Sequence, residues 1–277
     1  MKVGMLTAPV GDWTIEQLIC FAQCAGIGAF EINATGKSAH FDPDDAACGR
    51  KAADLVGEAG LEISSLAAYM NVTAGDEAER AATQAHLRKL LGCCEVMGIP
   101  VLCCMAGLPP AGMSKSDAIT QIAAPFYREL AKEAAAKNIK LALENWYATN
   151  IQHLGLWKQI FNEVPDENFG LNFDPSHLLW QDIDYLKAVE VFASRIFHTH
   201  AKDTEVVAHK KAWVGNQDGG GWWRYVIPGF GDVKWGPYLA RLRSIGYNGV
   251  LSIEHEDGAF SWEDGFRIGA KYLGQFI

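Results

Sequence analysis

Four short apolar runs of this sequence each end on a side chain that commonly binds metal ions. They read IKLALE to Glu144, FGLNFD to Asp174, RIFHTH to His200 and GVLSIE to Glu254. If the runs are neighbouring parallel strands, the four groups emerge at the same edge of one sheet. Two glutamates, an aspartate and a histidine suit one divalent ion, with Mn²⁺ favoured over Mg²⁺, Co²⁺ and Zn²⁺. The pattern therefore predicts a metal site, and a metal site at strand ends favours an enzyme.

Other side chains near these strand ends are candidates for contacts with a substrate. His177 follows the aspartate by three residues, and Lys202 follows the strand histidine by two, on the same predicted face. Arg224 lies beside a run of glycines and tryptophans, where it could bind an anionic group. Trp146 follows the first glutamate closely, and an aromatic face stacks well on a sugar ring. Each residue also has an ordinary interpretation, as a packed histidine, a solvated charge or a tryptophan on the rim of the fold.

The period of two along each run separates polar from apolar side chains. We expect His198 to face inward with the four proposed ligands, in a layer beneath them. Glu31 also faces inward at the end of an earlier strand, where it either orders the pocket or pairs with a basic residue. The outward faces are expected to pack against helices through Leu141, Leu143, Leu171, Phe173, Phe197, Leu251 and Ile253.

Helical and strand-like segments alternate along the whole chain, which predicts parallel pairing. Strands are expected at Lys2–Leu6, Ala29–Asn33, Leu61–Ala68, Ile99–Ala106, Ile139–Glu144, at the runs that end at Asp174 and His200, and at Val250–Glu254. Gly or Asn ends several of the intervening helices, as C-caps do. We therefore predict an α/β fold, a single-domain (β/α)₈ TIM barrel over residues 1–277, with a long inserted loop at Asp203–Trp235. A doubly wound sheet is the alternative, but its GxGxxG fingerprint is absent.

Composition restricts the function classes further. The 277 residues carry a net charge of −9, which argues against nucleic acid as a partner. No apolar run approaches the roughly 18 residues that span a bilayer, and the start does not read as a signal peptide. The seven cysteines are an odd number and include two adjacent pairs, which favours reduced thiols and a cytoplasmic location. The expected partner is a small sugar, and the sequence leaves open whether the chain forms a homo-oligomer.

In these residues the chain resembles the xylose isomerase-like superfamily of sugar isomerases, epimerases and type IV apurinic endonucleases. The resemblance covers nearly the whole chain and is most specific in LALENW, NFDPSHL, HTHAKD, IPGFGDVKW and GYNGVLSIEHED. It implies a TIM barrel, a four-ligand metal site at Glu144, Asp174, His200 and Glu254, and a substrate contact from His177. The extra histidine ligands of the endonucleases are missing, and His40 lies in a loop. Asn150 and Val206 stand where the ketose 3-epimerases have Glu and Arg.

The resemblance implies metal-dependent isomerisation or epimerisation of a keto-sugar or sugar derivative. The ion would polarise the carbonyl and stabilise an enediolate, while Glu144 and Glu254 exchange a proton on opposite faces of the carbon. The alternative is a dehydratase or lyase on a keto-sugar or inosose, in which the same enediolate expels a leaving group. A sugar-binding barrel without catalysis is the third hypothesis.

Overall fold

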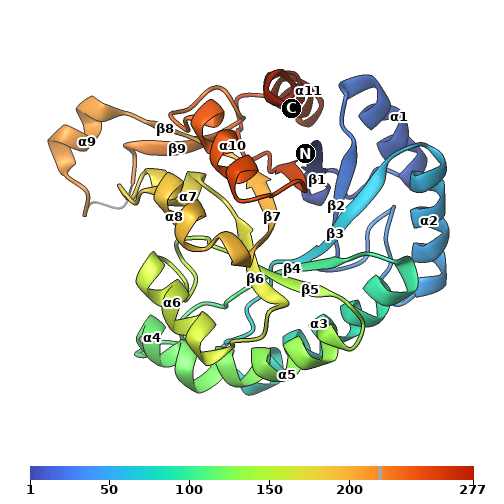
Figure 1. Cartoon of the computed structure of the whole chain (residues 1–277), viewed down its shortest axis with the longest axis horizontal. Coiled ribbons are helices and arrows are strands. Elements are labelled where there is room, and N and C mark those ends of the chain that lie inside the picture. The colour runs from blue at the N-terminus through green and yellow to red at the C-terminus, as the bar shows by residue number, and fades with distance from the viewer. Residues whose placement is uncertain (218–219) are drawn as a thin grey trace.

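The predicted strands all form in the computed structural model, which describes residues 1–217 and 220–277. Among these residues, eight parallel strands close into a barrel in the order β1, β10, β7, β6, β5, β4, β3, β2 (Figure 1). Their bounds are β1 (Lys2–Leu6), β2 (Ala29–Asn33), β3 (Glu62–Ala68), β4 (Val101–Met105), β5 (Lys140–Glu144), β6 (Phe169–Phe173), β7 (Ile196–Ala201) and β10 (Val250–Ile253). Because β1 pairs with both β2 and β10, the sheet has no open edge. The TIM barrel is confirmed, and the doubly wound alternative is wrong.

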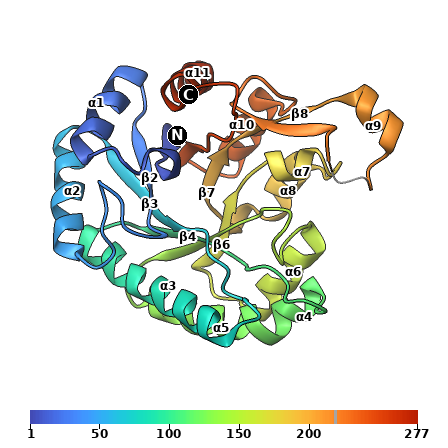
Figure 2. The same cartoon turned by 180° about the vertical axis from the view of Figure 1, so that it is seen from behind.

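Helices surround the barrel (Figure 2). Those that connect successive barrel strands are α1 (Ile15–Ala25), α2 (Ala46–Glu58), α3 (Glu77–Met97), α4 (Lys115–Ala118), α5 (Ala124–Ala135), α6 (Leu154–Glu163), α7 (Ser176–Leu179), α8 (Tyr185–Val191) and α10 (Trp235–Ser244), and α11 (Trp262–Leu273) closes the chain. Local sequence sets their ends. A capping box of Thr14 and Gln17 starts α1, and Gly26 ends it with a φ of 71° that favours glycine.

The apolar core lies between the barrel and the helices, as the alternation along the strands predicts. Leu141, Leu171 and Ile253 belong to this outer core. Phe197 does not, because a bulge between β6 and β7 shifts the register there, and it packs against the inner cluster that includes Val101 and Ala142. Gly170 makes this possible, since a Cβ at that position would lie 2.6 Å from the Phe197 ring. The outward orientation predicted for Phe197 is wrong.

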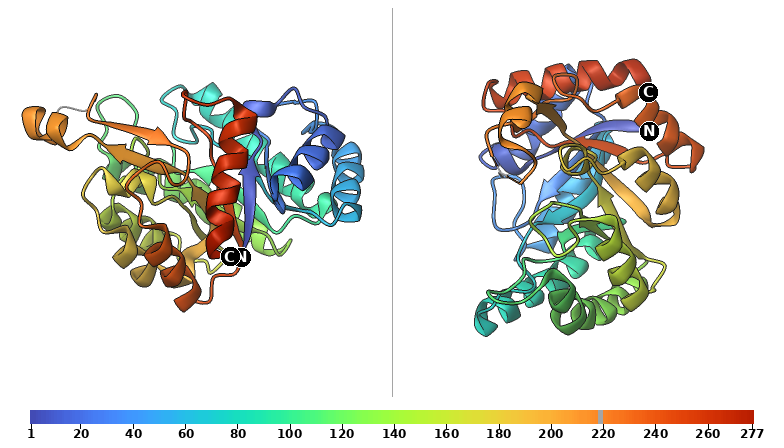
Figure 3. Two further views of the ribbon diagram at one scale, coloured as in Figure 1. Left: turned by 90° about the horizontal axis from the view of Figure 1, so that it is seen from above. Right: turned by 90° about the vertical axis from the view of Figure 1, so that its left-hand side faces the viewer.

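The insertion after β7 is a hairpin rather than the predicted loop. Strands β8 (Asp203–Val206) and β9 (Trp223–Val226) pair antiparallel, and α9 (Ala208–Val214) lies between them. This unit extends from one side of the barrel (Figure 3). Asp203 anchors its base by accepting bonds from the Trp235 indole and the backbone of Gly229 and Val233. Residues 218 and 219 of the predicted insertion lie outside the described residues. Nowhere in 1–217 or 220–277 does a helix have the length and apolar character to cross a bilayer.

Candidate active site

The four predicted metal ligands lie together at the carboxyl ends of neighbouring barrel strands. Glu144 is the last residue of β5, Asp174 directly follows β6, and Glu254 directly follows β10. His200 lies near the end of β7, between them in the barrel order. All four residues are buried. The barrel topology therefore brings to one place residues that are up to 110 positions apart in the sequence.

Side-chain distances define a compact cluster. Ligand atoms of Glu144, Asp174, His177 and Glu254 all lie within 4.8 Å of one another. His200 reaches this group through Nδ1, which is 3.2 Å from Glu144 Oε1 and 3.0 Å from Glu254 Oε2. The geometry thus places both His177 and His200 beside the carboxylates, whereas the sequence prediction included only His200 among the ligands.

The chemistry of the cluster fits a divalent ion. Asp174 Oδ2 is fully buried and has no hydrogen-bond partner among the described residues, although His177 Nε2 and Lys202 Nζ lie 3.3 and 3.4 Å away. Asn145 holds this aspartate in place, because its side chain bonds both the backbone N–H and the carbonyl of Asp174. A buried carboxylate oxygen without a hydrogen bond is costly unless a cation neutralises it. Three carboxylates and a histidine are ligands that such an ion takes.

Lys202 brings a buried positive charge to the same cluster. Its Nζ lies 2.6 Å from Glu254 Oε2 and 3.3 Å from His177 Nε2. Burial alone would lower the pKa of Lys202, but the surrounding carboxylates outweigh it and raise the pKa well above its usual value. Burial would raise the pKa of Glu254, yet Lys202 and His200 lower it to about 2. At neutral pH, this pair is therefore an ammonium facing a carboxylate.

The inserted hairpin contributes a residue that sequence reasoning missed. Tyr225, on β9, has its hydroxyl 2.6 Å from His177 Nδ1, and Lys202 Nζ lies 4.5 Å from the centre of its ring. Beyond Tyr225, an aromatic cluster continues through Trp223, Trp180 and Tyr147, and the first two are stacked with ring centres 4.4 Å apart. The only sign of this residue in the sequence was the strand period of two in β9, which puts Tyr225 on the same face as Trp223. These rings form a wall next to His177 that suits the apolar face of a sugar ring.

The structure places the other two predicted substrate contacts outside the carboxylate cluster. Arg224 is half-exposed and forms ion pairs with Glu205 at 2.6 Å and Asp257 at 3.1 Å, so it links β9 to the segment after β10. Trp146 is partly buried and packs edge-on against Tyr147, with ring centres 5.8 Å apart. Arg224 thus links two segments around the site, and Trp146 lies next to the aromatic wall.

A second polar layer lies beneath the cluster, inside the barrel. Glu31 is fully buried, and its Oε2 lies 3.1 Å from His200 Nε2. Burial would raise the pKa of Glu31, but His200 and His198 outweigh it and lower the pKa to about 2. Glu31, Cys103 and His198 also have ligand atoms within 4.8 Å of one another. However, the two ring nitrogens of His198 already contact Asn172 Oδ1 and Ser64 Oγ, each at 3.0 Å, which places His198 in the layer beneath the proposed ligands.

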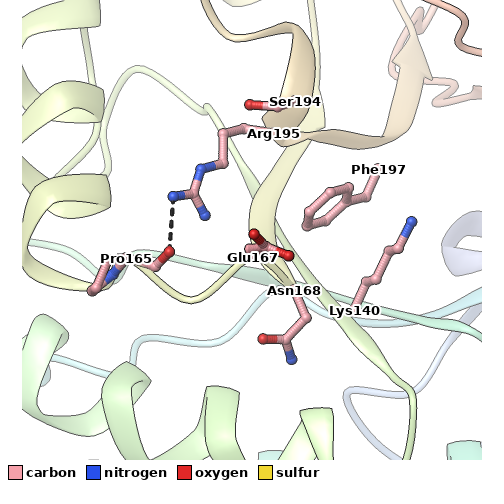
Figure 4. Close-up of a pocket in the computed structure, with 7 residues that line it drawn as sticks. All are labelled: Lys140, Pro165, Glu167, Asn168, Ser194, Arg195 and Phe197. Atoms are coloured by element: carbon pink, nitrogen blue, oxygen red, sulfur yellow. Dashed lines mark hydrogen bonds between the residues drawn. The ribbon is translucent and has the colours of Figure 1, made fainter.

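A separate pocket opens at the opposite, amino end of the strands (Figure 4). Lys140, Arg195 and Phe197 line it together with Pro165, Glu167, Asn168 and Ser194. Arg195 donates to the carbonyls of Pro165, Asp166 and Phe169, so its guanidinium already has partners. None of the predicted site residues lines this pocket, and in TIM barrels that end of the strands serves stability rather than catalysis.

Sequence relatives of the chain include enzymes that act on sugars. It is 26% identical over 312 residues to the uncharacterized protein YfiH of Bacillus subtilis, covering 100% of this chain and 99% of that protein. Inosose dehydratase of Histophilus somni is 31% identical over 51% of this chain, and the match spans about half of that enzyme, 49%. L-ribulose 3-epimerase of Methylomonas sp. is 29% identical, with 73% of this chain and 66% of that enzyme covered.

Solved structures with the same fold share less sequence. The IolI protein with a bound zinc atom has a TM-score of 0.77 at 18% identity, covering 100% of this chain and 99% of that one. The 3-keto-D-glucoside 4-epimerase YcjR of E. coli has a TM-score of 0.76 at 16% identity, with 99% of both chains covered. A family model described as the xylose isomerase-like TIM barrel matches residues 21–276, nearly the whole chain. With its closed barrel and its acidic cluster at the strand ends, this chain belongs to the xylose isomerase-like TIM barrel family.

Proposed function

We propose that this protein is a divalent-metal-dependent enzyme that moves a proton on the carbon beside the carbonyl of a keto-sugar or sugar derivative. One observation carries the proposal. Glu144 and Glu254 come from strands that are separated by β6 and β7 in the barrel, yet both reach the same nitrogen, His200 Nδ1. They therefore approach one point from two sides. The sugar epimerases and dehydratases among the relatives, and zinc in IolI, support the same class of chemistry.

The residues of the cluster have separate tasks in this proposal. Glu144, Asp174 and Glu254, with His200 or His177, would hold the ion, which polarises the substrate carbonyl when bound. Glu144 and Glu254 both have a lowered pKa, despite a burial that acts to raise it, because cationic neighbours favour their ionised forms. Either carboxylate can therefore accept the proton from one face of the carbon, and the partner on the opposite face returns one.

Lys202 and His177 would bind the oxygens of the substrate. The Lys202 ammonium is positioned to stabilise negative charge on an oxygen as the proton leaves carbon. Tyr225 holds His177 by a 2.6 Å hydrogen bond to Nδ1, which leaves Nε2 directed at the carboxylates and at Lys202. The wall of Tyr147, Trp180 and Trp223 would exclude water on one side and pack against the sugar ring.

Dehydration is the second candidate, and the pair of His177 and Lys202 favours it. An elimination needs a group that protonates the departing hydroxyl, and these two nitrogens lie 3.3 Å apart beside the glutamates. One residue set can thus support proton return to carbon or loss of water, according to which substituent lies next to the acid. The inosose dehydratases among the relatives perform a reaction of the second type by name.

Product analysis separates the two reactions. The Mn²⁺-loaded protein would be incubated with a panel of unphosphorylated and phosphorylated keto-sugars and with inososes, and the products identified by NMR and mass spectrometry. An epimer or isomer of unchanged mass supports the first reaction, and a product lighter by one water supports the second. If substrates bind and no member of the panel is converted, the chain is a sugar-binding barrel and the proposed activity is wrong.

A further inference from the structure

The imidazole of His200 is held from the side that faces away from the carboxylate cluster. Its Nδ1 faces Glu144 and Glu254, whereas its Nε2 lies 3.1 and 3.3 Å from the two carboxylate oxygens of Glu31. Glu31 is the middle residue of β2 and His200 lies on β7, so this contact crosses the interior of the barrel. Both side chains are fully buried. A charged carboxylate without access to water must have hydrogen-bond donors, and His200 Nε2 is one of them.

Tyr69 and Asn172 lie beside the contact between Glu31 and His200, and the Tyr69 oxygen and Asn172 Nδ2 are each 3.0 Å from His200 Nε2. The Tyr69 hydroxyl donates to Glu31 Oε1, and Asn172 Nδ2 donates to the Tyr69 oxygen at 2.9 Å. Of the two hydrogens on Asn172 Nδ2, one is thus donated to the Tyr69 oxygen. The Glu31 carboxylate offers acceptors alone. The arrangement is therefore satisfied when His200 Nε2 carries a hydrogen and donates it to Glu31.

This hydrogen bond determines which nitrogen of His200 can bind an ion. An ion binds the neutral form of the ring, which has one N–H and one lone pair, and the partner of the N–H fixes the tautomer. With the hydrogen on Nε2, the lone pair is on Nδ1, which faces the carboxylates. A carboxylate that accepts the N–H of a metal-binding histidine also makes the other nitrogen a stronger electron-pair donor to the ion and restricts the orientation of the ring.

We propose that Glu31, supported by Tyr69, is a positioning residue that keeps His200 in the Nε2–H tautomer and so presents Nδ1 as a ligand to the divalent ion. The inference rests on the proposed function, because it requires that an ion binds at the cluster. It assigns a role to a residue of β2 and to the residue directly after β3, neither of which is among the proposed ligands. The ligand set on the later strands is thereby tied to the first half of the barrel.

Metal affinity is the primary test. Glu31→Gln removes the charge and one acceptor, and the Kd for Mn²⁺ should increase about 10–100-fold, the usual effect of losing a partner behind a metal ligand. Tyr69→Phe leaves the carboxylate in place and should weaken binding by a smaller factor. Tyr127→Phe is the matched control, because this buried tyrosine also donates its hydroxyl, to the Met105 carbonyl, but lies in the outer core. Its Kd should equal that of the wild type.

The tautomer gives a readout that a general loss of packing would not produce. ¹⁵N-histidine NMR of the Zn²⁺-loaded protein should show His200 with a protonated Nε2 and an ion-bound Nδ1. In Glu31→Gln, the Nε2 signal should shift or divide between two tautomers. A folded Glu31→Gln protein with the wild-type Kd and an unchanged His200 spectrum would overturn the inference. Should Glu31→Gln fail to fold, an unchanged Kd and spectrum for Tyr69→Phe would overturn it, and a several-fold weaker Kd with an altered spectrum would support it.

The same titrations distinguish this inference from the proposed function. Asp174→Ala removes a proposed ligand and should abolish stoichiometric binding. If the wild-type protein binds none of Mn²⁺, Mg²⁺, Co²⁺ and Zn²⁺, the proposed function fails and the role of Glu31 fails with it. If the wild type binds and Asp174→Ala does not, but Glu31→Gln behaves as wild type, only the role of Glu31 is wrong.

Discussion

Replacing Lys202 by methionine tests whether its ammonium neutralises the carboxylate cluster. Lys202 is 1% exposed, and its Nζ lies 2.6 Å from Glu254 and 3.4 Å from both Asp174 and Glu256. Methionine keeps much of the length of the side chain and removes the charge. Breaking a buried ion pair from one side typically costs roughly 3–5 kcal/mol, because the remaining charge stays buried without its partner. We expect a loss of that size in the metal-free protein.

The loss should be visible as a lower melting temperature that a metal ion restores. For chains of this size, roughly 2–4 °C in Tm corresponds to each kcal/mol, so metal-free Lys202→Met should melt about 6–20 °C below the wild type. Mn²⁺ returns positive charge to the same carboxylates and stabilises the folded state by binding to it. The difference between variant and wild type should therefore shrink when both are loaded with metal.

Thermal unfolding with EDTA and with excess Mn²⁺ is the assay, followed by circular dichroism. Lys187→Met is the matched control, since Lys187 forms an exposed ion pair with Glu190 at 2.8 Å, and such pairs contribute roughly 0–1 kcal/mol. If metal-free Lys202→Met melts within the range of this control, the ammonium does not neutralise the cluster. If Mn²⁺ fails to narrow the difference, the ion does not bind among these carboxylates.

Three further predictions concern catalysis, the hairpin and the response to pH. Glu144→Gln and Glu254→Gln should each lower turnover by about 10²–10⁴-fold, because an amide cannot accept the proton; wild-type rates in variants that retain metal by elemental analysis would exclude this pair. Arg224→Ala should raise KM or lower kcat several-fold through loss of its bonds to Glu205 and Asp257, and steady-state kinetics equal to wild type would remove Arg224 from the site. His198 has a pKa lowered to about 4, chiefly by burial, so below pH 6.5 the unfolded chain binds a proton that the folded protein does not. The free energy of unfolding of the metal-free protein should therefore decrease by about 3 kcal/mol more in wild type than in His198→Gln between pH 6.5 and 4, and parallel urea-denaturation profiles for the two proteins would contradict this.

Much of the barrel could be predicted because its signals are local. The strand residues form continuous apolar runs, and the helix ends carry caps such as Thr14 and Gly26 that act within one turn. The four strand-end residues could be proposed as ligands for the same reason, since a polar residue that ends an apolar run is visible without knowledge of the pairing. Their convergence then followed from the parallel arrangement alone.

The features that were missed depend on contacts between distant segments. Phe197 faces the interior because of a bulge opposite β6, and a bulge changes the alternation in a way that the sequence of β7 alone does not reveal. Tyr225 reaches His177 only because β9 pairs with β8 and folds over the site. Glu31 contacts His200 on the side of the ring away from the carboxylate cluster and is 169 residues from it in the sequence. The inward orientation of Glu31 could therefore be predicted, but its contact with His200 could not.

Exchange of hydrogen at carbon tests the central claim most directly. The measurement is deuterium incorporation from D₂O at the carbon beside the carbonyl of the substrate that the product screen identifies. It would compare the Mn²⁺-loaded wild type, the wild type in EDTA and Asp174→Ala. Rapid incorporation is expected for the loaded wild type, and its loss is expected in the other two samples. Equal incorporation in all three, or none by a wild-type protein that holds one equivalent of metal and converts its substrate, would contradict metal-dependent proton transfer at this site.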